Sequence, residues 1–161
     1  KKIYDIPKSN TIFIHGSIKK KRSDIILGHA WNPAANTSLK NEVDFESIDT
    51  RVLEGNEIVN QYFHKTFKPT SKIIQSYNDF FNSLRHISNI HILGHSLSNV
   101  DIEYFQAIIE YIDMNNVLWV ISYYSQEELD KHIQTMKTLG IHASNIKFIK
   151  LEDLSSERLE K

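Results

Sequence analysis

Apolar positions along the chain follow two kinds of pattern. Short apolar and β-branched runs, which are typical of buried strands, occur at residues 11–14, 24–27, 90–93, 117–123 and 145–151. Segments whose apolar positions recur at about 3.6 residues, as in amphipathic helices, occur at residues 47–67, 70–84, 101–114 and 125–139, and a short helix is predicted at 155–161. From residue 89 onward, strands and helices alternate, which favours a parallel sheet with crossover helices.

The run at residues 117–123 is apolar throughout, which is typical of a strand covered on both faces. We therefore predict an α/β fold, a Rossmann-like three-layer domain with a mostly parallel sheet of about five strands flanked by helices. A chain of 161 residues without an obvious linker is expected to form a single α/β domain over residues 1–161. Because the sequence opens with Lys1-Lys2 and no methionine, we expect it to be a piece of a longer protein.

Glycine and histidine occur together at the end of three predicted strands. His15-Gly16 follows the first, Gly28-His29 the second and Gly94-His95 the third. Ligands of open α/β sheets bind where strands end and loops turn toward helices. We therefore predict that His15, His29 and His95 come together on one rim of the sheet. The alternative is that the glycines only end strands and the histidines are solvated loop residues.

The loop after residues 90–93 concentrates polar side chains. Ser96 and Ser98 supply hydroxyl groups, and Asn99 or Asp101 is suited to cap the following helix. Together with backbone N–H groups at a helix start, these groups are candidates to hold ribose or phosphate.

Composition excludes several classes of function. The net charge is −1, so the whole molecule makes no strong case for nucleic-acid binding, although residues 19–22 form a local basic cluster. The chain contains no cysteine, which excludes a disulfide scaffold and a cysteine nucleophile. No apolar run approaches the ~20 residues of a membrane span, and no secretory signal is visible. We therefore expect a cytoplasmic protein without a membrane partner.

Three pieces of the sequence, residues 14–16, 25–29 and 92–101, together with Tyr104-Phe105, resemble a known set in the same order. They resemble the C-terminal part of the AbiH family of abortive-infection antiphage proteins, which is in turn similar to sirtuin-like NAD-binding domains. The resemblance implies a role in phage defence and a site for NAD or a related nucleotide, without a metal. It implies that His15 is catalytic in cleavage of the nicotinamide–ribose bond. Nucleotide contacts are expected from Gly16, Gly28, His29, Gly94, His95, Ser96, Ser98 and Asp101.

The sequence departs from the family pattern in one respect: it contains neither the glycine-rich strand–turn–helix nor the Asn-Tyr motif that usually precede His-Gly. Part of any cofactor site is therefore expected outside these residues. A phage component or a partner protein is a further possible ligand, and the oligomeric state stays open.

Three other interpretations remain. The first is a serine hydrolase, because residues 94–98 approximate the G-x-S-x-G turn around Ser96, with Asp113 and His142 as partners. The second is a metal site formed by His15, His29 and His95. The third is a non-catalytic sensor or interaction module that uses the same fold.

Overall fold

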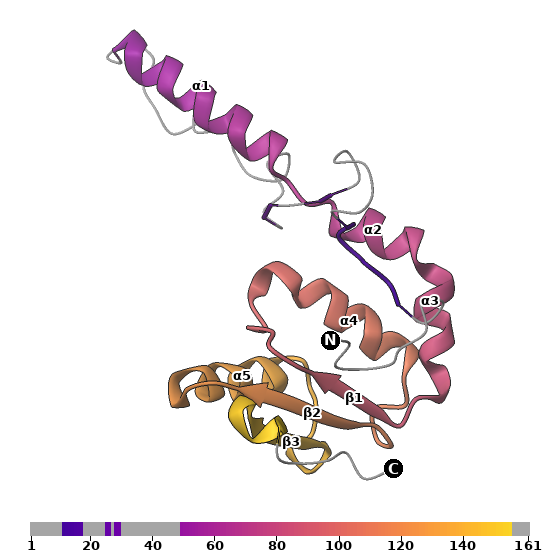
Figure 1. The fold of residues 1–161 in the computed structure, drawn as a ribbon. Helices are drawn as coiled ribbons and strands as arrows, with labels where there is room; N and C mark the ends of the chain where they lie inside the picture. The colour runs from indigo at the N-terminus through magenta and orange to yellow at the C-terminus, as the bar shows by residue number, and fades with distance from the viewer. Residues whose placement is uncertain (1–10, 18–24, 27, 30–48, 156–161) are drawn as a thin grey trace. The chain divides into compact units, whose positions relative to one another are not determined.

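The computed structural model describes residues 11–17, 25–26, 28–29 and 49–155 of the chain. The chain divides into two compact units, Lys1–Pro69 and Thr70–Lys161, which we call the N-terminal and the C-terminal unit and describe one at a time. Figure 1 shows the elements of both units. No helix among the described residues has the length and apolar character needed to cross a membrane.

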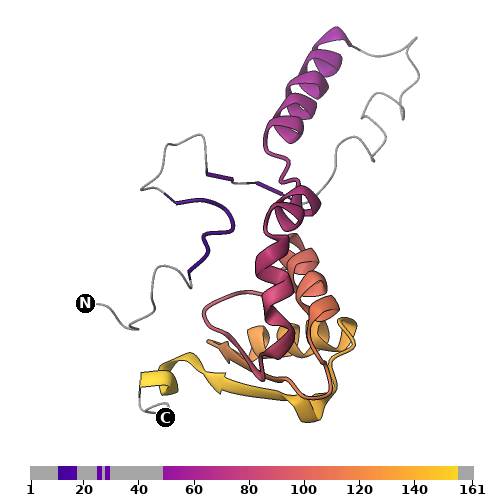
Figure 2. The same ribbon diagram turned by 90° about the vertical axis from the view of Figure 1, so that its right-hand side faces the viewer.

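The C-terminal unit is built on a parallel sheet. Within residues 70–155 the strands are β1 (Asn89–Ile92), β2 (Leu118–Tyr123) and β3 (Ile146–Lys150), in the order β1-β2-β3. Ile92 is in register with Ile121, which is in register with Phe148. Helix α4 (Ile102–Tyr111) joins β1 to β2, and α5 (Gln126–Thr138) joins β2 to β3. The parallel strands lie side by side in Figures 1 and 2. This confirms the alternation predicted from residue 89 onward.

The core of this unit surrounds β2. Trp119 and Ile121 are fully buried on one face of the strand. They belong to a buried cluster that also contains Ile92, Leu97, Phe105, Val117, Met136 and Ile141. Because Phe105 comes from α4 and Met136 from α5, both crossover helices cover this face. Val120 and Ser122, whose side chains point to the other face, are also buried. The burial of consecutive residues explains why the β2 sequence is apolar apart from Ser122 and the terminal Tyr123.

Helix α5 begins and ends where the sequence predicts. The Ser125 side chain accepts a hydrogen bond from the Glu128 N–H at 3.2 Å, as an N-cap does. At the other end Gly140 has φ +75°, a conformation that glycine adopts at low cost. The Ile141 N–H then donates to the Met136 carbonyl at 3.1 Å, which is the bond of a Schellman motif.

The predicted helix at residues 70–84 is interrupted. It forms α2 (Thr70–Ser76), α3 (Asn78–Ser83) and the 3-10 turn η4 (Leu84–His86). The Ser76 hydroxyl donates to the Ile73 carbonyl at 2.7 Å, and the Tyr77 N–H donates to the Ile74 carbonyl, which tightens the chain before α3. Local serine bonds of this kind compete with the helical backbone pattern.

The described part of the N-terminal unit contains α1 (Thr50–Lys65), whose N-cap is Asp49. The strand predicted at residues 11–14 is wrong, because the Gly16 N–H donates to the Phe13 carbonyl and closes a turn there. Residues 25 and 26 are not in a strand either, while 24 and 27 lie outside the described residues. The described residues therefore contain one sheet of three strands, fewer than the five predicted. The predicted helix at 155–161 falls outside the described residues, apart from Ser155, the last residue of the 3-10 turn η7 (Leu151–Ser155).

Candidate functional site

A cleft of about 740 Å³ opens between the loop that follows β1 and one side of α5. The loop contributes Ser96, Leu97, Ser98 and Asn99, and α5 contributes Glu127, Asp130, Lys131, Gln134 and Thr135. We call this cleft the β1–α5 pocket. It lies at the carboxyl end of β1, where open parallel sheets bind their ligands. Its volume falls within the range of small-molecule sites.

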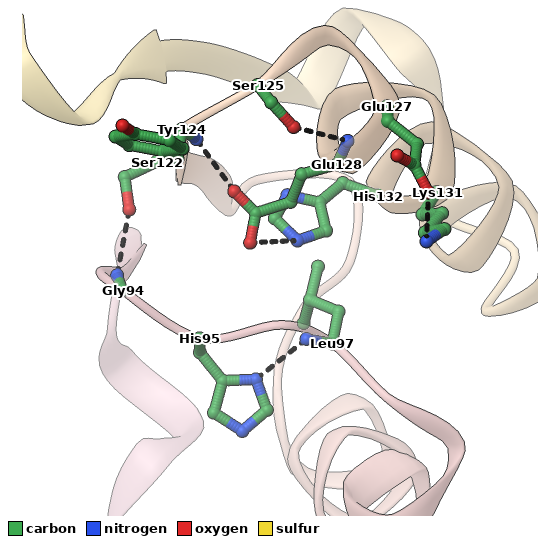
Figure 3. A network of polar contacts seen from close by, with 10 residues as sticks. All are labelled: Gly94, His95, Leu97, Ser122, Tyr124, Ser125, Glu127, Glu128, Lys131 and His132. Carbon is green, nitrogen blue, oxygen red and sulfur yellow. Dashed lines mark hydrogen bonds and ion pairs between the residues drawn. The ribbon is translucent and has the colours of Figure 1, made fainter.

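Ser122 fixes the turn that leaves β1. Its hydroxyl accepts a hydrogen bond from the Gly94 N–H at 2.8 Å, and its side chain is buried within β2 (Figure 3). The bond ties the start of the loop to the neighbouring strand. Ser122 was not among the predicted site residues. The signal that could have identified it is a single serine within a strand of otherwise apolar and aromatic residues.

His95 holds the loop through both nitrogens of its ring. Nδ1 accepts a hydrogen bond from the Leu97 N–H at 2.9 Å, and Nε2 lies 3.3 Å from Asp101 Oδ2. Because Nδ1 is an acceptor, this hydrogen-bond geometry assigns the proton of the neutral ring to Nε2, facing Asp101. The ring also meets the Phe105 ring edge-on, with centroids 5.4 Å apart. His95 is therefore a positioning residue for the loop.

Leu97 has an unusual backbone conformation for a residue with a side chain. Its φ is +50°, in a region that non-glycine residues seldom adopt and that occurs often at functional sites. Such a conformation costs about 1–3 kcal/mol. Burial of its side chain in the core and its bond to His95 offset this cost. In Figure 3 the Leu97 side chain points toward α5. Ser96 and Ser98 flank this anchored residue, and both line the pocket.

The α5 wall of the pocket is charged. The Lys131 ammonium lies 2.7 Å from Glu127 Oε1, and the Gln126 side chain donates to Asp130 Oδ1 at 3.0 Å. The hydrogen bond and the charge of the partner lower the pKa of the Glu127 carboxyl and raise the pKa of Lys131. The charged residues that line the pocket are thus two carboxylates and one ammonium.

His132 is fully buried on the inner side of α5. Its Nε2 lies 3.9 Å from Glu128 Oε1, which is too far for a hydrogen bond. The other carboxylate oxygen, Glu128 Oε2, accepts from the Tyr124 N–H at 2.7 Å. Burial lowers the pKa of His132, an effect that the Glu128 carboxylate and the backbone of Ser96 oppose in part. Because its pKa is lowered, this buried imidazole is uncharged at neutral pH. Figure 3 shows its ring beside the Glu128 carboxylate.

The predicted site residues fall into two groups. Gly94, His95, Ser96, Ser98 and Asp101 lie in or beside the loop. Of these, His95 contacts Asp101, whereas Gly94 is bonded to Ser122. The remaining four lie in the N-terminal unit: His15, Gly16, Gly28 and His29. The common rim for His15, His29 and His95 stays a prediction.

Backbone contacts within the N-terminal unit show a structural role for His15 and for Gly28. The His15 carbonyl accepts from the Ile26 N–H at 2.9 Å, which joins the two segments. Gly28 lies against Thr66, and a Cβ added at Gly28 would lie 1.7 Å from the Thr66 carbonyl oxygen. The glycine is needed there for close approach of two backbone segments.

The serine-hydrolase interpretation fails on geometry. Ser96 follows the carboxyl end of β1, whereas Asp113 precedes β2 and His142 precedes β3. In a parallel sheet these positions lie at opposite ends, so the three residues cannot form a triad. Among the described residues, no group of three His, Asp or Glu side chains could hold a metal ion.

Comparison with known proteins identifies a family. The family model described as Bacteriophage abortive infection AbiH matches residues 1–123, which is more than half of the chain. The match includes β1, the whole loop wall of the pocket, α4 and β2, whereas α5 follows it. No curated protein and no solved structure matches. The chain belongs to the AbiH family, and this membership supports a role in bacteriophage abortive infection.

Proposed function

We propose that this abortive-infection protein acts in the cytoplasm by binding NAD or a related nucleotide in the β1–α5 pocket. One observation carries the proposal: a loop anchored at both ends presents Ser96 and Ser98 to a cleft at the carboxyl end of a parallel strand. A rigid loop is suited to recognition because little conformational entropy is lost when the ligand binds.

The lining residues suit a nucleoside. The Ser96 and Ser98 hydroxyls and the Asn99 amide line the cleft. Each can donate and accept hydrogen bonds, which matches ribose hydroxyls and a carboxamide. A small number of fixed polar groups in a cleft of this size is typical of cofactor sites. The expected similarity of the AbiH family to sirtuin-like domains implies the same ligand class.

We propose hydrolysis of the nicotinamide–ribose bond as the reaction, with His15 as the general base that the family resemblance implies. A water oxygen would bond to the ribose C1′ as the bond from C1′ to the nicotinamide nitrogen breaks. Nicotinamide would leave with that electron pair, and His15 would take the proton of the water. His95 is not suited to this role, since both of its ring nitrogens are engaged within the loop.

Titration calorimetry with NAD and ADP-ribose tests the binding. We expect saturable heats with the native chain and at least tenfold weaker binding for Ser96→Ala. Ser88→Ala is the matched control, because Ser88 is exposed and lies at the amino end of β1. Native protein that produces no binding heat, or equal losses in both variants, would contradict the proposal.

A second candidate is a sensor that binds the nucleotide without cleaving it. This is favoured by the described lining of the pocket, in which no hydroxyl is hydrogen-bonded to a base and the one cation is paired with Glu127. Release of nicotinamide from NAD separates the two candidates. The hydrolase predicts turnover that His15→Ala abolishes while binding persists, and the sensor predicts binding without turnover in either protein.

A further inference from the structure

The two helices that begin at this edge of the sheet carry acidic residues at their own N-termini. Asp101 immediately precedes α4 and Glu103 lies in its first turn, while Glu127 and Glu128 lie in the first turn of α5. The N-terminus of a helix attracts anions, and a phosphate site uses that attraction for its ligand. Here the acidic side chains place negative charge at both helix starts, which disfavours a phosphate.

Three backbone amides of the loop, at its start, its centre and its end, are engaged in hydrogen bonds. The Gly94 N–H donates to Ser122, the Leu97 N–H to His95 and the Asp101 N–H to the Ser98 carbonyl. A phosphate loop leaves successive N–H groups pointing at the ligand, usually by means of glycine. The centre of this loop is Leu97, whose side chain is buried in the core and whose N–H turns toward His95 (Figure 3).

The charge of the α5 wall also disfavours a phosphate in the pocket. Lys131 is the one cation among the described lining residues, and it is paired with Glu127. The charges of Glu127 and Lys131 cancel, so the carboxylate of Asp130 gives the lining a net charge of −1. Asp130 Oδ1 accepts from Gln126, while Oδ2 has no hydrogen bond within residues 70–155.

We infer that the β1–α5 pocket receives the ribose and the neutral or cationic base of its ligand, and that the phosphates lie outside it. The inference rests on the proposed nucleotide binding and names the part of the ligand that this cleft takes. Asp130 accepts hydrogen bonds from the vicinal hydroxyls of the ribose, because a carboxylate is an acceptor only. Its negative charge favours a cationic base such as the nicotinamide ring.

Calorimetry on the full chain with two cationic nucleosides tests the inference, one without phosphate and one with it. Nicotinamide riboside is expected to bind at least as tightly as nicotinamide mononucleotide. Asp130→Asn is expected to weaken riboside binding about tenfold, as loss of a charged hydrogen-bond acceptor does. Glu152→Gln is the control, because Glu152 is an exposed acid that is paired with Lys150 and does not line the pocket.

Two results would overturn the inference and leave nucleotide binding intact. One is a mononucleotide that binds at least tenfold tighter than the riboside, with an advantage that Lys131→Met removes. The other is riboside binding that Asp130→Asn leaves unchanged. Failure of the native chain to bind riboside, mononucleotide and NAD would overturn both the inference and the proposed function.

Discussion

The core around β2 and the β1–α5 pocket lie in the same unit but differ in the kind of side chain that forms them. The core is a nearly continuous set of apolar side chains, with Trp119 and Ile121 fully buried. The pocket is lined by polar and charged residues together with Leu97, which has an unfavourable backbone conformation. Leu97 belongs to both, since its side chain packs in the core while its backbone shapes the pocket. The comparison shows that packing of the Leu97 side chain in the core stabilises the strained backbone of the loop that lines the pocket.

The largest expected effect is loss of stability from a core substitution. Trp119→Ala should lower the free energy of unfolding by about 3–5 kcal/mol, because the side chain is fully buried and leaves a cavity. Leu118→Ala is the matched control: its side chain is 37 % exposed and points to the opposite face of β2. Denaturation followed by circular dichroism measures both, and similar losses would contradict the described core.

A second effect concerns the start of α4, close to the loop. Burial raises the pKa of Tyr104 to about 12, and the carboxylates of Asp101 and Glu103 add to the rise. The folded pKa exceeds the ordinary value of 10.0, so the stabilising contribution is present below about pH 10 and is lost as the pH rises toward about 12. Tyr104→Phe should reduce this alkaline loss, which denaturant titrations at a series of alkaline pH values measure. Tyr124→Phe, at a position 82 % exposed, should leave it unchanged.

A smaller effect is expected from His132, where the core meets the α5 wall. Burial lowers the folded pKa of His132 below 6.5. Its stabilising contribution is therefore present above about pH 6.5 and is lost as the pH falls through the folded pKa. His132→Leu should flatten the decline in stability as the pH falls below about 6.5. At neutral pH the variant should be about as stable as the native chain, because neither ring nitrogen makes a hydrogen bond within the described residues. Identical pH slopes for the two proteins would contradict this account.

The sequence predicts the fold from residue 89 onward because several local signals agree there. The apolar run of β2, the cap at Ser125 and the end at Gly140 each point to the observed elements. The strand predicted at residues 11–14 fails, since a short run of Thr11 and three apolar residues cannot reveal that its backbone closes a turn at Gly16. The interruption of the predicted helix near Ser76 likewise depends on a side-chain bond that periodicity does not encode.

The loop wall of the site could be predicted, and the α5 wall could not. Ser96, Ser98 and Asp101 are close in sequence, so any turn after β1 brings them together. Asp130 and Lys131 have the pattern of any solvated helix face, and their place in the pocket follows from how α5 packs on the sheet. The role of the Ser122 hydroxyl could not be predicted either, because its partner Gly94 is distant in sequence and lies in the turn that follows β1.

The central claim is that the ligand binds at the carboxyl end of β1, against α5. Amide chemical shifts of the labelled chain, recorded while NAD is added, test it most directly. The account predicts that the largest shift changes fall at residues 96–99 and 127–135, which form the two walls of the pocket. Changes concentrated at the apolar cleft around Gly140, Ile141 and Phe148 beside the amino end of β3, or no changes at all, would contradict it.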